Sequence, residues 1–128
     1  MIVLGIDPSY TRTGIAVLHC GDIPGTERVV ATGAIKTPTR LSDQERCREI
    51  AAQCETWARS YGVDAVGVEN QFVGEGNKQA GLRLVYLRSA IEQRIAGQIP
   101  GLKVVDVNPA QRQAALGVSN RLGRADVK

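Results

Sequence analysis

The sequence has little of what marks a secreted or membrane-bound protein. It holds three cysteines, an odd number without CxxC spacing, so neither a disulfide scaffold nor a zinc knuckle is supported. No apolar run approaches the ~18 residues that span a bilayer, and the apolar start at residues 1–6 lacks a basic region before it. These absences predict a cytoplasmic protein that inserts into no membrane.

A large excess of one charge is also missing. Sixteen Lys and Arg against thirteen Asp and Glu leave a net charge of +3, which permits a polyanionic partner without requiring one. The cations gather near the end of the chain, where Arg112, Arg121, Arg124 and Lys128 are accompanied by one acid, Asp126. Guanidinium groups suit phosphate oxygens, although a solvated helical surface would show the same pattern.

What is present is the composition of a single folded domain. The 128 residues leave room for one core, and 43% hydrophobic with 23% charged residues is an ordinary globular balance. Branched apolar segments between turn signals predict strands at 2–7, 13–20, 28–35, 63–69 and 103–107. Apolar residues at three- and four-residue steps predict helices at 41–61 and 78–96, and a short helix follows Asn108.

The order of these elements predicts an α/β fold. Three strands joined by tight turns form an antiparallel meander, and the αβαβα run that follows needs crossovers to parallel strands. We expect a mixed five-stranded sheet with helices on both faces. The helix at 78–96 has two apolar sides, one serving the sheet and the other a partner: Leu82, Val85, Tyr86, Ser89 and Ile95 on one, Leu84, Leu87 and Ile91 on the other.

Two acids stand at the carboxyl ends of predicted strands. Asp7 closes the first strand and Glu69 closes the fourth, and ligand sites of open α/β sheets gather at such ends. If these strands are parallel neighbours, their backbones lie ~4.8 Å apart, so two carboxylates on one face can share a divalent cation. The alternative is that Glu69 is a lone buried acid with a structural partner.

The turn after Asp7 is a candidate phosphate loop. Ser9 and Thr13 bring hydroxyl groups, and Gly14 allows close backbone approach. Alone this is a weak signal, because hydroxyl-rich turns are common.

Taken together, these segments resemble a known family. Gly5-Ile6-Asp7-Pro8-Ser9 through Thr13-Gly14, then Val68-Glu69-Asn70-Gln71-Phe72, are similar to the RuvC family of Holliday-junction resolvases, which have the ribonuclease H-like fold. The similarity continues in order through 78–91, Asn108-Pro109-Ala110-Gln111 and Gly117 to Val127.

The resemblance implies a homodimeric endonuclease that binds four-way DNA junctions and uses Mg²⁺ or Mn²⁺ to cut two strands. Asp7 and Glu69 match the first two of four metal-binding acids, and Phe72 matches an aromatic that stacks on unpaired bases. Helix 78–96 matches the one that joins the subunits. Arg124 matches a basic position near the cut strand, another such position falls near Arg112, and Arg121 adds DNA-binding charge.

The resemblance also sets an expectation for the domain. The family's last two acids lie on a helix beyond Lys128, so residues 1–128 are expected to form one ribonuclease H-like nuclease domain without its last helix. Such a chain, bacterial or phage-encoded, should bind branched DNA and cut it weakly or not at all. Phe72 is expected to be exposed on a loop, with a core role as the alternative.

Two other functions stay open at this point. One is a non-cleaving module of the same fold that binds branched nucleic acid. The other is a nucleotide phosphatase with an actin-like sheet, whose first strand also ends in Asp before a Gly-containing hairpin. That fold surrounds its nucleotide with two such domains, and 128 residues supply one.

Overall fold

The computed structural model describes residues 1–70 and 78–107. Within them lie five strands and two helices: β1 (Ile2–Asp7), β2 (Arg12–His19), β3 (Arg28–Lys36), α1 (Asp43–Tyr61), β4 (Ala65–Glu69), α2 (Lys78–Gln98) and β5 (Lys103–Val107). Each matches a predicted element, with bounds that differ by no more than two residues. The helix predicted after Asn108 lies outside the described residues.

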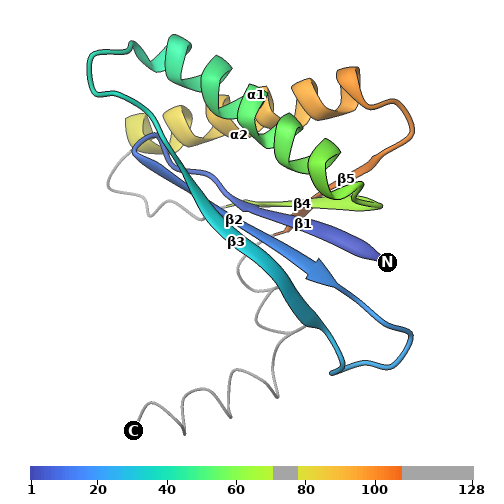
Figure 1. Cartoon of the computed structure of the whole chain (residues 1–128). Coiled ribbons are helices and arrows are strands. Elements are labelled where there is room, and N and C mark those ends of the chain that lie inside the picture. The colour runs from blue at the N-terminus through green and yellow to red at the C-terminus, as the bar shows by residue number, and fades with distance from the viewer. Residues whose placement is uncertain (71–77, 108–128) are drawn as a thin grey trace, which may run out of the picture.

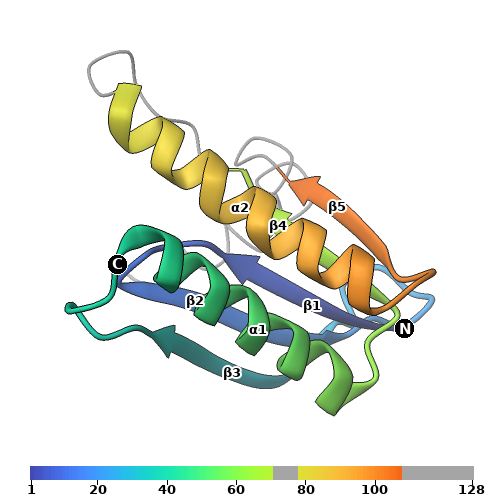
Figure 2. The ribbon, with the colours of Figure 1, turned by 90° about the horizontal axis from the view of Figure 1, so that it is seen from above.

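The sheet has the strand order β3-β2-β1-β4-β5. β1 pairs antiparallel with β2 and β2 with β3, whereas β1 with β4 and β4 with β5 are parallel. The predicted meander and crossovers, and with them the mixed five-stranded fold class, are therefore confirmed. Both described helices lie over the same face, α1 across β1, β2 and β3, and α2 on the side of β4 and β5 (Figures 1 and 2). No described helix covers the other face, so the expected helices on both faces stay a prediction.

Both ends of α1 are fixed by local sequence signals. Ser42 accepts a hydrogen bond from the Glu45 N–H, and the Glu45 side chain accepts one from the Ser42 N–H, which forms a reciprocal capping box. Gly62 ends the helix at φ 56°, a left-handed conformation that glycine adopts without strain. The helix therefore stops in time for the chain to enter β4.

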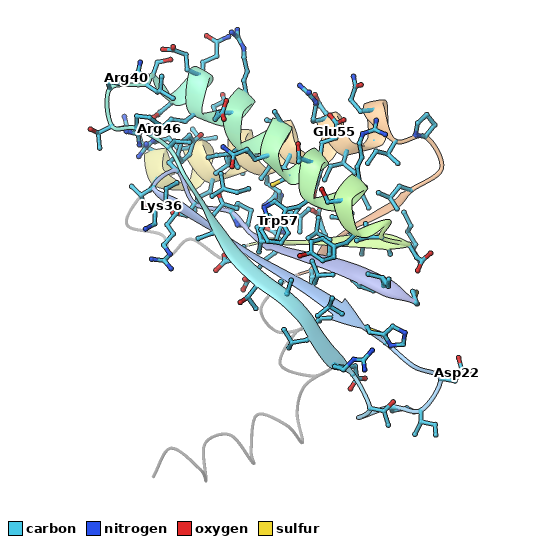
Figure 3. The ribbon with its side chains drawn as sticks, viewed as in Figure 1. Asp22, Lys36, Arg40, Arg46, Glu55 and Trp57 are labelled. Atoms are coloured by element: carbon cyan, nitrogen blue, oxygen red, sulfur yellow. The ribbon has the colours of Figure 1, made fainter. Side chains whose placement is uncertain are left out.

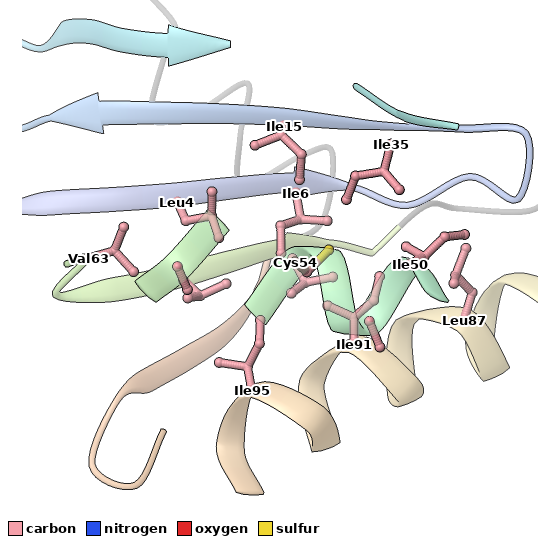
Figure 4. Packing of buried hydrophobic residues seen from close by; sticks show 14 of the residues in the cluster. Leu4, Ile6, Ile15, Ile35, Ile50, Cys54, Val63, Leu87, Ile91 and Ile95 are labelled. Atoms are coloured by element: carbon pink, nitrogen blue, oxygen red, sulfur yellow. The ribbon is translucent and has the colours of Figure 1, made fainter. Parts of the chain in front are cut away.

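The core fills the space between the helices and the covered face of the sheet (Figure 4). Alternate residues of β1 and β4 point into it, and Leu4, Ile6, Val66 and Val68 are at most 3% exposed. Cys54 on α1 is fully buried, and burial raises the pKa of its thiol to about 12. It therefore serves as a small hydrophobic side chain.

The two apolar sides of α2 face different surroundings. Leu87 and Ile91 are fully buried, whereas Leu82 and Tyr86 are 54% and 65% exposed. The division of this helix into a core side and an outer side is thus confirmed. The placement of Ile95 on the outer side is wrong: it is fully buried, because thirteen residues at about 100° each bring it nearly opposite Leu82.

Candidate active site

Asp7 and Glu69 end adjacent parallel strands in the same row. Ile6 is the register partner of Val68, so Asp7 and Glu69 are the next pair along β1 and β4. Because Ile6 and Val68 point into the core, side chains one residue further along point to the opposite face. The two carboxylates therefore share the face that α1 and α2 leave uncovered, with Asp7 exposed and Glu69 half-buried.

Glycines surround these acids on the uncovered face. Gly5 and Gly67, themselves register partners, lie two residues before them, and Gly14 on β2 pairs with Asp7. A Cβ at Gly14 would lie 3.6 Å from the Cβ of Asp7, and one at Gly67 would lie 3.4 Å from Val107. Because glycine has no side chain, these positions add no bulk beside the two carboxylates, and a phosphate group can approach the backbone there.

The turn between β1 and β2 is held by its own hydroxyl groups. Thr13 donates to the Ser9 carbonyl at 2.7 Å and accepts from the Ser9 N–H at 3.1 Å, and its side chain is fully buried. The sequence predicts that Ser9, Thr13 and Gly14 cradle a phosphate. The Thr13 hydroxyl instead points inward and stabilises the turn. Ser9 is half-buried, with its hydroxyl 3.2 Å from that of Thr11.

A second group of contacts, which sequence reasoning missed, holds the chain just after Glu69. The Asn70 N–H donates to the Val107 carbonyl at 2.7 Å, and the Asn70 side-chain oxygen accepts from Arg88 of α2. Arg88 also lies 3.6 Å from the Asp106 carboxylate. An arginine on the core side of an amphipathic helix is the only sequence signal that could have singled it out.

The two acids suit a hard divalent cation. Carboxylate oxygens are the ligands that Mg²⁺ and Mn²⁺ prefer, and two of them on one face with glycines around them leave room for an ion and its waters. Over residues 1–70 and 78–107, no group of three or more His, Cys, Asp or Glu gathers as a metal site. The described residues thus supply a pair of acidic ligands.

Several predicted site residues fall outside the described ranges. Phe72, Arg112, Arg121 and Arg124 belong to 71–77 or 108–128, so their roles stay predictions. His19 is exposed at the end of β2. No helix within the described part of the chain is both long and apolar enough to cross a membrane.

A mixed sheet of this order, with acids at the ends of its first and fourth strands, defines the ribonuclease H-like class. The family model described as crossover junction endodeoxyribonuclease RuvC matches residues 3–126. The chain therefore belongs to the RuvC family.

Relatives and solved structures agree with this assignment. Crossover junction endodeoxyribonuclease RuvC of Cutibacterium acnes is 32% identical over 126 residues, covering 98% of this chain and 62% of that protein. The protein of the same name from Thermobifida fusca is 37% identical over 133 residues, covering 99% and 68%. The Thermus thermophilus RuvC structure matches with a TM-score of 0.76 and 27% identity over 91% of this chain and 69% of that one. This chain thus spans about three fifths of the Cutibacterium relative.

Proposed function

We propose that this protein is a structure-selective endonuclease that resolves four-way DNA junctions by metal-dependent phosphodiester hydrolysis. The observation that carries the proposal is the parallel register of β1 and β4, which puts Asp7 and Glu69 in one row. A Thermus thermophilus structure titled as RuvC in complex with Holliday junction substrate matches this chain with a TM-score of 0.72 and 27% identity, which supports the choice of substrate.

In this proposal Asp7 and Glu69 hold Mg²⁺ or Mn²⁺. A bound divalent ion supplies an activated water and neutralises charge on the phosphate and on the leaving 3′ oxygen. The protein's own part is to fix two carboxylates at strand ends and to keep bulky side chains away from them. Gly14 does the latter, because a Cβ at this position would lie 3.6 Å from the Cβ of Asp7.

A junction-cleavage assay tests the proposal. A four-way junction labelled on one strand is incubated with Mg²⁺, with Mn²⁺ or with EDTA, beside a linear duplex of the same sequence. Because the described residues supply two acidic ligands, we expect weak metal-dependent cutting of the junction, which Asp7→Asn and Glu69→Gln abolish and which Asp22→Asn, an exposed acid at the far end of the sheet (Figure 3), retains. Equal cutting of the linear duplex would contradict junction selectivity. Tight junction binding without cutting in Mn²⁺ would instead favour the non-cleaving module.

We propose further that the outer side of α2 joins two copies of the chain. Leu82, Val85 and Tyr86 are 54%, 40% and 65% exposed on one side of this helix, which is more apolar surface than a solvated helix needs. A two-fold contact through them would present two sites for paired cuts. Sedimentation should show a dimer that Tyr86→Glu dissociates and that Gln98→Glu, an exposed position at the end of α2 on the side opposite Leu82, leaves intact.

The phosphatase alternative is supported only at the level of the fold. The Aquifex aeolicus PPX-GPPA enzyme matches with a TM-score of 0.53 and 17% identity, covering 37% of that chain. Release of phosphate from a nucleoside triphosphate, without DNA cutting, would favour the phosphatase.

For the location, we propose the bacterial cytoplasm, supported by bacterial relatives and by cysteines that form no disulfide in the structure.

A further inference from the structure

A cavity opens beside the candidate active site, on the helix side of the same sheet edge. It measures about 270 Å³ and lies where the β1–β2 turn meets the first turns of both helices. Its lining includes Ser9, Tyr10, Thr11, Arg46, Arg83 and Leu84, and we call it the arginine cavity. Ser9 follows Asp7 by two residues, so their Cα atoms lie within about 7 Å of each other.

Arg46 of α1 has donors to spare in this cavity. Its Nε is buried and has no hydrogen-bond partner among the described residues. A buried guanidinium nitrogen without an acceptor is costly, and a small turn of the Arg46 side chain toward an anion in the cavity would supply one. The fork of an arginine fits two oxygens of one phosphate group.

Arg83 forms the opposite wall and is held in place. Its Nε and one terminal nitrogen donate to the two carboxylate oxygens of Asp43 at 2.8 and 3.0 Å, and its guanidinium lies 4.6 Å from the centre of the Tyr10 ring. Asp43 therefore offsets the charge of Arg83. The net positive charge of the cavity comes from Arg46.

The floor of the arginine cavity is rigid. The buried Tyr10 donates its hydroxyl to the Arg83 carbonyl at 2.6 Å, and its own carbonyl accepts from Thr37 at 2.7 Å. These bonds fix the turn from which Ser9 and Thr11 line the cavity, with their hydroxyls 3.2 Å apart. Outside the cavity, Lys36 and Arg40 extend the positive surface at the same end of the molecule (Figure 3).

We propose that the arginine cavity binds a phosphate group of the DNA strand that passes the active site, one or more nucleotides from the phosphate at Asp7 and Glu69. The proposal rests on the proposed nuclease function and adds a positioning site to it. A backbone phosphate held by Arg46, with Ser9 and Thr11 as further donors, would set how far along the strand the cut falls. Phosphate contacts of this kind fix register without reading sequence.

The salt dependence of DNA affinity tests this directly. Each lost phosphate contact makes the fall of log K with log salt less steep by about 0.9 on duplex DNA, so a variant that binds as the wild type does near 1 M salt should bind about eightfold more weakly than the wild type at 0.1 M. We expect this for Arg46→Gln and not for Arg48→Gln, an exposed arginine two positions along that lies outside the cavity. Arg46→Lys should restore the slope but only part of the affinity, because it keeps the charge and loses the fork. Thermal unfolding of each variant shows that it is folded.

The outcomes separate this site from the function on which it rests. Junction binding by Arg46→Gln with an unchanged slope would overturn the arginine cavity and leave the nuclease standing. If Arg46→Gln makes the dependence of log K on log salt less steep on single-stranded and duplex DNA alike, and the wild type shows no preference for junctions, the result would support the cavity and contradict the junction function. Inorganic phosphate is the second probe: if it binds the wild type but not Arg46→Gln while DNA affinity is the same for both, the cavity serves a free phosphate and the proposal is wrong.

Discussion

The two faces of the sheet differ although the same strands build both. On the covered face Leu4 and Ile6 of β1 are at most 3% exposed, packed beneath α1 and α2. On the other face the alternating positions of the same strand are Gly5 and the exposed Asp7. Because side chains alternate between the two faces, one short strand supplies core residues to one face and a candidate metal ligand to the other.

The comparison predicts that damage to the covered face costs stability above all. Ile91→Ala removes a fully buried side chain between α2 and the sheet, so the free energy of unfolding should fall by about 2–5 kcal/mol. Urea denaturation measures it. Val105→Ala, on β5 with 40% of its surface exposed, should cost less than about 1 kcal/mol. Equal losses would mean that the uncovered face is also part of the core.

Damage to the other face should cost metal affinity and not stability. Asp7→Asn keeps the shape of the side chain and removes its charge, so Mn²⁺ binding should weaken by about 100-fold while the urea midpoint stays unchanged or rises. Calorimetric titration with Mn²⁺ measures the affinity, with Asp22→Asn as the matched control. Unchanged Mn²⁺ binding in Asp7→Asn would remove this carboxylate from the metal site.

One substitution made on both faces gives a finer test. A Cβ at Gly33 on β3 would lie 2.6 Å from the Trp57 ring, whereas one at Gly5 would lie 3.7 Å from its nearest neighbour, the Ala16 carbonyl oxygen. Gly33→Ala must displace the ring and should cost about 1–2 kcal/mol, while Gly5→Ala should cost less. Trp57 is the chain's one tryptophan, so its fluorescence should shift in Gly33→Ala alone.

The sequence predicts the elements and the place of the acids because both depend on local pattern and chain order. Apolar periods locate the strands and helices, and the carboxyl ends of parallel strands meet wherever crossovers connect them. It does not predict the inward turn of the Thr13 hydroxyl, the arrival of Arg88 at Asn70, or the cavity between Arg46 and Arg83. Those depend on which distant side chains meet once the helices pack, and no local period records that.

The smallest effect concerns two acids at the edge of the covered face. Glu92 of α2 lies near Asp106 of β5, and burial, then the neighbouring Asp106 carboxyl, raises the pKa of Glu92 to about 7. Its Oε1 is buried without a hydrogen-bond partner among the described residues, and a hydrogen bond to the Asp106 carboxyl also favours the protonated form of Glu92. Arg88 offsets part of the repulsion.

Because the folded state raises this pKa above the usual value of 4.5, folding favours the protonated acid. Stability from this group is therefore fully present below about pH 4.5 and falls as the pH rises toward 7, where the carboxylate must be charged. Glu92→Gln keeps the shape without the charge, so it should flatten that decline and raise stability at pH 8 by roughly 1 kcal/mol, a partial effect because the pair is partly solvated. Urea midpoints at pH 5 and pH 8 measure both. If the variant and the wild type lose the same stability between these pH values, Glu92 is already charged at pH 5 and the covered face tolerates the pair at no cost.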